Sequence, residues 1–204
     1  MFPIVFQPMK VPVHVAQHPF LNPANQLTIC RILFIPLLVV LYYSPFEWRF
    51  LASGALFGLA GITDALDGYI ARKYNIASPF GAFLDPVADK LMVAVALALL
   101  IQSHNDVMFT LPAIVIICRE IVISALREWM AELGKRASVA VSSIGKVKTS
   151  FQIAAIVLLL AFTPDAFPLF NKVGFVALYA AAVLTIWSMF VYIKAAWPAL
   201  MGKE

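Results

Sequence analysis

The chain has little cysteine and little histidine, with 2 and 3 of these residues in a length of 204. Cys30 and Cys118 both fall in apolar segments and lack the spacing of zinc ligands, so we expect two buried side chains and no disulfide. The histidines are dispersed along the sequence and are assigned no role. These shortages argue against a disulfide framework and against a metal centre built from cysteine and histidine.

Charged residues are also scarce, at 13% of the chain, whereas hydrophobic residues make up 62%. The mean hydropathy of +0.89 is far above that of soluble domains. This composition predicts an all-α, polytopic membrane protein. The net charge of +4 comes from basic residues scattered near predicted helix ends, so it reflects membrane topology rather than binding to nucleic acid.

Six apolar runs, each near the roughly 20 residues that a helix needs to cross a bilayer, predict six transmembrane helices. We place them at about 26–44, 49–72, 82–103, 109–133, 145–163 and 172–194. A polar stretch at 21–31 predicts a short amphipathic interfacial segment before the first span, whose polar side chains could face the acidic cluster of residues 64–89 or cap the helix. The expected domains are a proline-rich cytoplasmic lead at 1–21, a membrane domain at 22–195 and a short cytoplasmic tail at 196–204.

Basic residues are distributed unequally between the two sides of this predicted topology. One side carries Arg49 and Lys172, and the other carries Lys10, Arg72, Lys73, Lys135, Arg136, Lys194 and Lys203. By the positive-inside rule both termini are cytoplasmic. Nearly all charge within the spans then falls in the cytoplasmic halves of the second to fifth helices, while the sixth span is almost wholly apolar. The pattern predicts a polar cavity open to the cytoplasm and to the inner leaflet.

Residues 64–89 contain 4 of the 11 acidic residues of the chain. At about 100° per residue, Asp64 and Asp67 share a face of one predicted helix, and Asp85 and Asp89 share a face of the next. Carboxylates at membrane depth are costly and repel one another unless cations neutralise them. Oxygen ligands without cysteine or histidine favour magnesium, manganese or calcium over zinc. The sequence therefore predicts a divalent metal site, with interhelical ion pairing or a water-filled cavity without chemistry as the alternative. Only Arg72 and Lys90 are close enough in sequence to neutralise the aspartates, which favours the metal site.

A pair of divalent ions held by carboxylates is suited to phosphoryl transfer, and one carboxylate can serve as general base for a hydroxyl nucleophile. A second phosphate-bearing substrate needs cations of its own, for which the candidates are Lys90, Arg119, Arg127, Lys146 and Lys148. Each candidate also has a simpler explanation. The arginines could pair with neighbouring glutamates, and the lysines could anchor helix ends at the interface or balance the acidic cluster.

The acidic stretch has fixed residues at fixed spacing. It reads Asp64-x2-Asp67-Gly68-x2-Ala71-Arg72-x8-Gly81-x3-Asp85-x3-Asp89, and it resembles at every fixed position the signature of the CDP-alcohol phosphatidyltransferase family. The further stretches Asn25-x2-Thr28-x2-Arg31, Arg119-Glu120, Arg127-Glu128 and Gly145-Lys146-x-Lys148-Thr149 resemble the bacterial members that make phosphatidylglycerophosphate. The resemblance covers roughly residues 22–195 and leaves the proline-rich lead without a function.

This resemblance implies a homodimer of six-helix subunits in the bacterial inner membrane, with a cytoplasmic active site and two Mg²⁺ or Mn²⁺ ions. The implied metal ligands are Asp64, Asp67, Asp85 and Asp89, of which Asp89 is also the catalytic base. The implied CDP-lipid site comprises Asn25, Thr28, Asp64, Asp67, Gly68, Ala71, Arg72, Gly81 and Asp85. The implied reaction transfers the phosphatidyl group of CDP-diacylglycerol to sn-glycerol 3-phosphate, whose phosphate the basic candidates would bind, and releases CMP.

Three alternatives remain open at this point. The acceptor could be serine or inositol phosphate, although the basic residues favour a phosphorylated acceptor. A cation-coupled or proton-coupled transporter would also place carboxylates within the membrane, but the outer halves of the spans lack charge and we detect no inverted repeat. A lipid-binding scaffold would use the same residues without chemistry.

Overall fold

The computed structural model describes residues 23–74, 79–134 and 143–201, without the side chains of 23–24, 67–74, 79 and 143–147. The regular structure in these ranges is helical. It consists of α1 (Pro23–Tyr43), α2 (Arg49–Tyr74), α3 (Pro79–His104), α4 (Val107–Glu132), α5 (Ser143–Ala161) and α6 (Pro168–Leu200). The predicted all-α architecture and its six helices are therefore confirmed.

Two boundaries differ from the sequence-based prediction. α1 is one helix from Pro23 to Tyr43, so residues 23–31 continue into the first apolar run and do not form a separate segment before it. α6 extends to Leu200 and takes in the first residues of the predicted tail. In both cases the backbone hydrogen bonds of the helix continue into polar or mixed sequence, whereas hydropathy marks only the apolar part of the helix.

Four of the helices are long and apolar enough to cross a bilayer, namely α1, α2, α4 and α6. They define a polytopic membrane protein. The outward surfaces fit this environment, because large apolar side chains such as Val176 and Phe190 are 71% and 65% exposed. Cys30 and Cys118 are also exposed and unbonded, so the expectation that they are buried is wrong. An apolar segment in a membrane protein buries only one face in protein and leaves the other to lipid.

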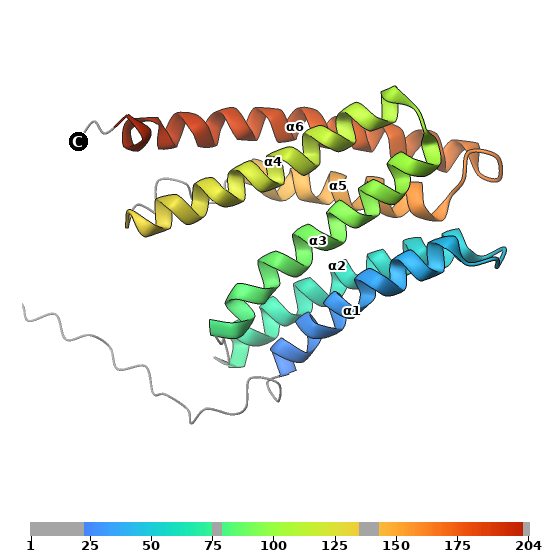
Figure 1. Cartoon of the computed structure of the whole chain (residues 1–204), viewed down its shortest axis with the longest axis horizontal. Helices are drawn as coiled ribbons and strands as arrows, with labels where there is room; N and C mark the ends of the chain where they lie inside the picture. The colour runs from blue at the N-terminus through green and yellow to red at the C-terminus, as the bar shows by residue number, and fades with distance from the viewer. Residues whose placement is uncertain (1–22, 75–78, 135–142, 202–204) are drawn as a thin grey trace, which may run out of the picture.

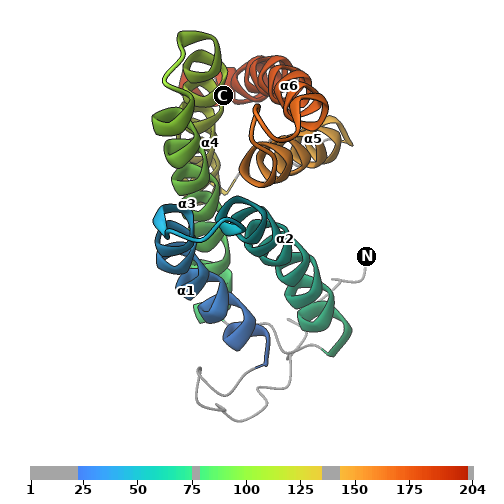
Figure 2. The same ribbon diagram turned by 90° about the vertical axis from the view of Figure 1, so that its right-hand side faces the viewer.

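The helices form two groups joined by α3 (Figures 1 and 2). α1 packs against α2 and α3, whereas α5 packs against α6 and α4 packs against α6. Contact between α2 and α5 holds the groups together. In Figure 1 the ends of α2, α4 and α6 lie toward the left, as do the beginnings of α1, α3 and α5. The charged parts of α2, α3, α4 and α5 are thus gathered at one end of the molecule.

A continuous apolar core fills the space between the helices. Its fully buried members come from α1, α3, α4, α5 and α6 and include Leu38, Leu97, Ile116, Leu160 and Leu178. Glycine allows the closest approach between the two groups, because a Cβ atom added at Gly54 of α2 would lie 2.6 Å from the Cβ of Ala161 on α5. A small residue at this position therefore permits close packing of α2 against α5.

Candidate active site

Carboxylates of α2 and α3 meet around a buried arginine of α1. Arg31 is 1% exposed, and its Nη1 lies 2.9 Å from Oδ1 of Asp64. The same nitrogen donates a hydrogen bond to Oδ1 of Asp89, and both carboxylates remain 45% exposed. Two of the predicted acidic ligands, 25 residues apart in the sequence, therefore flank one cation. Arg31 was not predicted in this role, because it lies far from the aspartates in the sequence, whereas Arg72 and Lys90 lie beside them.

The third described carboxylate, Asp85, is held by a second residue of α1. Thr28 is 1% exposed, and its hydroxyl donates a 2.5 Å hydrogen bond to Oδ1 of Asp85. Asn25, three residues earlier and one helical turn away, is equally buried. The polar residues at the start of α1 thus face α3, as one of the two sequence interpretations expected. Their predicted contact with a CDP-lipid stays a prediction.

Several predicted site residues have backbones in helices but side chains outside the described set. Asp67, Gly68, Ala71 and Arg72 belong to the last turns of α2, and Lys146 belongs to the first turn of α5. Gly81 is buried near the start of α3. The helical backbone puts Asp67 on the same face of α2 as Asp64, as the spacing requires.

The donor set is chemically suited to a hard divalent cation. Asp64, Asp85 and Asp89 supply carboxylate oxygens, which Mg²⁺ and Mn²⁺ prefer. Among the side chains that the structure describes, no group of three acidic, histidine or cysteine residues is already arranged around a common point. Arg31 instead provides the positive charge between Asp64 and Asp89. These residues fit a metal site in ligand type, and a bound cation would share the carboxylates with Arg31.

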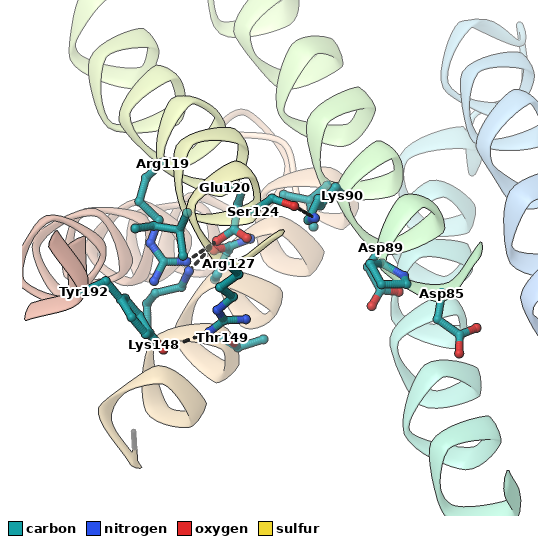
Figure 3. Close-up of a pocket in the computed structure, with 14 residues that line it drawn as sticks. Asp85, Asp89, Lys90, Arg119, Glu120, Ser124, Arg127, Lys148, Thr149 and Tyr192 are labelled. Atoms are coloured by element: carbon teal, nitrogen blue, oxygen red, sulfur yellow. Dashed lines mark hydrogen bonds and ion pairs between the residues drawn. The ribbon is translucent and has the colours of Figure 1, made fainter. Parts of the chain in front are cut away.

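A cavity of about 510 Å³ opens beside this cluster. We call it the inter-helix cavity; it is lined by residues of α3, α4, α5 and α6, with Asp85 and Asp89 on one side and basic residues on the other (Figure 3). The polar residues that line it are Asp85, Asp89, Lys90, Arg119, Glu120, Ser124, Arg127, Lys148, Thr149, Gln152 and Tyr192. Four of the five predicted phosphate-binding residues are therefore brought together, and the fifth, Lys146, lies outside the described side chains.

Glu120 forms ion pairs with two of these cations, Arg119 and Lys148. Its Oε1 accepts hydrogen bonds from Nη1 of Arg119 at 3.0 Å and from Nζ of Lys148 at 2.5 Å. Nη2 of Arg119 donates to the hydroxyl of Ser188 at 2.9 Å. The ion pairing that sequence analysis weighed for Arg119 is thus present, yet it leaves the guanidinium on the cavity wall, where it can still bind an anion.

The other two cations are held by neutral partners. Arg127 donates a 2.8 Å hydrogen bond to the hydroxyl of Tyr192, and its guanidinium lies 5.1 Å from the centre of that ring. Arg119 also faces the ring, at 5.6 Å. Lys90 donates to the hydroxyl of Ser124. Neutral partners orient these cations without cancelling their charge, so the basic side of the cavity keeps its attraction for anions.

The contribution of α6 was not predicted. The sixth span was predicted to be almost wholly apolar and was given no part in the cavity, yet Tyr192 lines the cavity and Ser188 accepts a hydrogen bond from Arg119. The two residues are four positions apart and so lie on one helix face. Two polar residues at this spacing in an apolar span could have predicted that this face of α6 lies against the cavity.

Comparison of the sequence with known protein families gives a match. The family model described as CDP-alcohol phosphatidyltransferase matches residues 21–187. The chain belongs to the CDP-alcohol phosphatidyltransferase family. The match includes the acidic cluster and all five basic candidates, while Ser188 and Tyr192 follow just after it.

Individual members of the CDP-alcohol phosphatidyltransferase family are also similar over nearly their whole length. A protein of Pseudomonas fluorescens named CDP-diacylglycerol--glycerol-3-phosphate 3-phosphatidyltransferase is 51% identical over 88% of this chain and 92% of its own. A protein of Sodalis glossinidius with the same name is 53% identical over 86% of this chain and 95% of its own. A third, from Salmonella choleraesuis, is 52% identical over 86% and 94%.

Proposed function

We propose that this protein transfers the phosphatidyl group of CDP-diacylglycerol to sn-glycerol 3-phosphate, giving phosphatidylglycerophosphate and CMP. The observation that carries the proposal is the similarity to relatives named for this reaction, at 51–53% identity over 86–88% of the chain. The inter-helix cavity supports it, because carboxylates and cations share one space there. A phosphorylated acceptor explains the cations better than serine would.

The acidic side of the cavity is assigned to the CDP-lipid and its metal ions. Two Mg²⁺ or Mn²⁺ ions would be held by Asp64, Asp67, Asp85 and Asp89, and when bound they would neutralise phosphate oxygens and stabilise charge on the leaving group. The nucleotide and its phosphates would be held by the same α2 and α3 segments, through Asp64, Asp67, Gly68, Ala71, Arg72, Gly81 and Asp85. Asn25 and Thr28 support these segments from α1, with Thr28 fixing Asp85.

The basic side of the cavity is assigned to the acceptor phosphate. Arg119 and Arg127 of α4 present planar guanidinium groups that suit phosphate, and Lys90 of α3 and Lys148 of α5 add positive charge to the cavity lining. Lys146, two residues before Lys148, is a further candidate. Asp89 and Lys90 are neighbours on α3, so an acceptor whose phosphate lies among the cations has its free end close to Asp89.

The chemical step follows from this placement. Asp89 takes the proton of the acceptor 1-hydroxyl, and the resulting oxygen attacks the phosphorus that carries the diacylglycerol group. A new phosphorus–oxygen bond forms as the bond to the CMP phosphate breaks, and CMP leaves with the bonding electrons. Holding both substrates in one cavity aligns them for this displacement.

The membrane arrangement completes the proposal. All six helices would span the inner membrane of a bacterium, with both termini and the open end of the cavity in the cytoplasm. Residues 22–195 would form the membrane domain between the 1–21 lead and the 196–204 tail, and two copies would form a homodimer. The ends of α2 and α4 and the beginnings of α3 and α5 lie toward one end of the bundle (Figure 1), and the charged residues of these segments support a single-sided active site.

The test is CMP release from CDP-diacylglycerol by the purified protein in detergent with magnesium or manganese. We expect release with glycerol 3-phosphate, little with serine or inositol phosphate, and none after chelation of the metal. Release with another acceptor alone would move the enzyme to a sister activity of the family. Absence of release with every acceptor, together with cation counterflow in sealed vesicles, would favour the transporter.

A further inference from the structure

Two buried polar atoms on the wall of the inter-helix cavity lack hydrogen-bond partners among the described residues. They are Nε of Arg119 and Oε1 of Gln152, whose residues are 7% and 4% exposed. Native proteins rarely leave such atoms unsatisfied, because the desolvation cost is not recovered. The pair consists of one donor and one acceptor, which suits a ligand that offers both an anionic oxygen and a hydroxyl group.

The other polar groups on this wall are already engaged. The Ser124 hydroxyl accepts from Lys90, and the Tyr192 hydroxyl accepts from Arg127. Glu120 accepts from two cations. Thr149 also has a partner, and the hydroxyls of Ser124 and Tyr192 keep only their O–H donors, so Oε1 of Gln152 is the buried neutral acceptor on the described wall whose hydrogen bond is not made.

The chemistry of an amide decides which part of the acceptor it meets. A carbonyl oxygen can only accept, so it pairs with a hydroxyl and gains nothing from a deprotonated phosphate oxygen. The terminal torsion of glutamine is soft, so either end of the amide can turn toward a hydroxyl, which both donates and accepts. Arg119 Nε, by contrast, is a donor and is suited to the phosphate.

The position of Gln152 on α5 points to one particular hydroxyl. It lies four residues after Lys148 and so on the same helix face, about 6 Å farther along the axis. Lys148 is assigned to the acceptor phosphate, and the 1-hydroxyl is assigned to Asp89. The hydroxyl on the middle carbon of the acceptor is the group left without a partner.

We infer that Gln152 is a specificity-determining residue whose side-chain amide hydrogen-bonds the C2 hydroxyl of a three-carbon polyol phosphate. The inference rests on the proposed function and deepens it. It assigns the phosphate, the middle hydroxyl and the attacking hydroxyl to the basic residues, Gln152 and Asp89, respectively.

The experiment compares two acceptors in the CMP-release assay. One is glycerol 3-phosphate, and the other is 3-hydroxypropyl phosphate, which keeps the attacking hydroxyl and the phosphate but lacks the C2 hydroxyl. We expect the unaltered protein to prefer glycerol 3-phosphate by about tenfold in kcat/KM, as one buried hydrogen bond allows. Gln152→Met should lose this preference by becoming slower with glycerol 3-phosphate alone.

Thr185→Val is the matched control. Oγ1 of Thr185 is also buried without a partner among the described residues, but Thr185 lies on α6 away from the cavity lining. This variant should keep the full preference. Gln152→Glu retains an acceptor oxygen at the same place, so it should keep the preference while its added charge weakens both acceptors.

The outcomes separate the two proposals. An unaltered protein with no preference, or a Gln152→Met variant with an unchanged preference, would overturn the role of Gln152 while leaving the reaction established. Loss of the preference in Gln152→Glu would also overturn it. If the unaltered protein releases no CMP with glycerol 3-phosphate, the proposed function itself fails.

Discussion

Lys148 on α5 and Glu120 on α4 are joined by a 2.5 Å hydrogen bond between Nζ and Oε1 on the wall of the inter-helix cavity. Lys148 is 3% exposed as a residue, so its charge depends on this carboxylate. The pair has two separable roles: it stabilises the contact between two helices, and it presents a cation to the proposed acceptor phosphate.

Removing Lys148 should damage both roles. Lys148→Met should lower the free energy of unfolding by about 1–3 kcal/mol, because among the described side chains Glu120 keeps only Arg119 as an ionic partner. It should also raise the KM for glycerol 3-phosphate about tenfold. In the double variant Glu120→Gln/Lys148→Met, stability should recover only in part, because Arg119 loses its carboxylate partner, while the KM stays high. A KM that recovers together with stability would show that Lys148 acts only in packing.

Asp89→Asn should retain CDP-diacylglycerol binding and lose turnover. The amide cannot take a proton from the acceptor, and loss of a general base typically costs about 10²–10⁴-fold in rate. Asp64→Ala and Asp67→Ala should instead weaken metal and nucleotide binding together. Binding of the CDP-lipid by calorimetry, measured beside CMP release, distinguishes the two effects, and near-normal turnover in Asp89→Asn would contradict its role as base.

Arg31→Met should make the folded protein more dependent on divalent cations. Without Arg31, Asp64 and Asp89 lose their common positive partner, and stability without metal should fall by about 1–3 kcal/mol. Magnesium should then raise the unfolding temperature more in the variant than in the unaltered protein. Arg49→Met is the control, since Arg49 donates to the Ser44 carbonyl at the other end of the bundle. Equal metal effects in all three proteins would refute this account.

Tyr192→Phe tests the contribution of α6. The variant keeps the ring beside both guanidinium groups but removes the hydroxyl that accepts from Arg127 at 2.8 Å. The KM for glycerol 3-phosphate should rise about threefold with kcat nearly unchanged. Tyr179→Phe removes a hydroxyl of the same helix that donates to the Met108 carbonyl, and it should leave both constants alone. An effect of equal size in both variants would point to helix packing instead.

Gly54→Ala should destabilise the contact between the two helix groups. The new Cβ would lie 2.6 Å from Cβ and 3.0 Å from Cα of Ala161, so backbone must move, at a cost of about 1–3 kcal/mol. Gly58→Ala is the matched control on the same helix, because its Cβ would meet Val157 at an ordinary 3.7 Å. Ala161→Gly should rescue Gly54→Ala only in part. Thermal unfolding of the four proteins tests this, and equal midpoints for the two glycine variants would contradict it.

Local sequence was sufficient for the features that depend on spacing along one helix. Hydropathy located all six helices, and the spacing of Asp85 and Asp89 placed both on one face of α3. Contacts between helices were not accessible in this way. Arg31 and Asp89 are 58 positions apart, and Arg127 and Tyr192 are 65 apart. Such pairs depend on how each helix rotates in the bundle, which no single segment specifies.

Burial was also predicted poorly, for a related reason. Cys30 was expected to be buried because it lies in an apolar segment, and cysteine is among the residues most often buried in proteins. In a bilayer the outward face costs nothing, and Cys30 is exposed while the charged Arg31 beside it is enclosed. Polar residues in these helices therefore mark the face that packs against protein. Apolar residues occur on both the protein-facing and the lipid-facing side, so they distinguish neither.

Asp89 and Lys90 are consecutive residues of α3, and their fixed separation bears on the length of the acceptor. Consecutive side chains on a helix diverge by about 100°, and these two turn toward Arg31 of α1 and Ser124 of α4, respectively. In the proposed reaction Asp89 takes the proton of the attacking hydroxyl and Lys90 contacts the phosphate, so α3 fixes part of the spacing between these two groups. An acceptor longer or shorter by one carbon would place its hydroxyl away from Asp89 when its phosphate is bound, whatever its affinity for the cations.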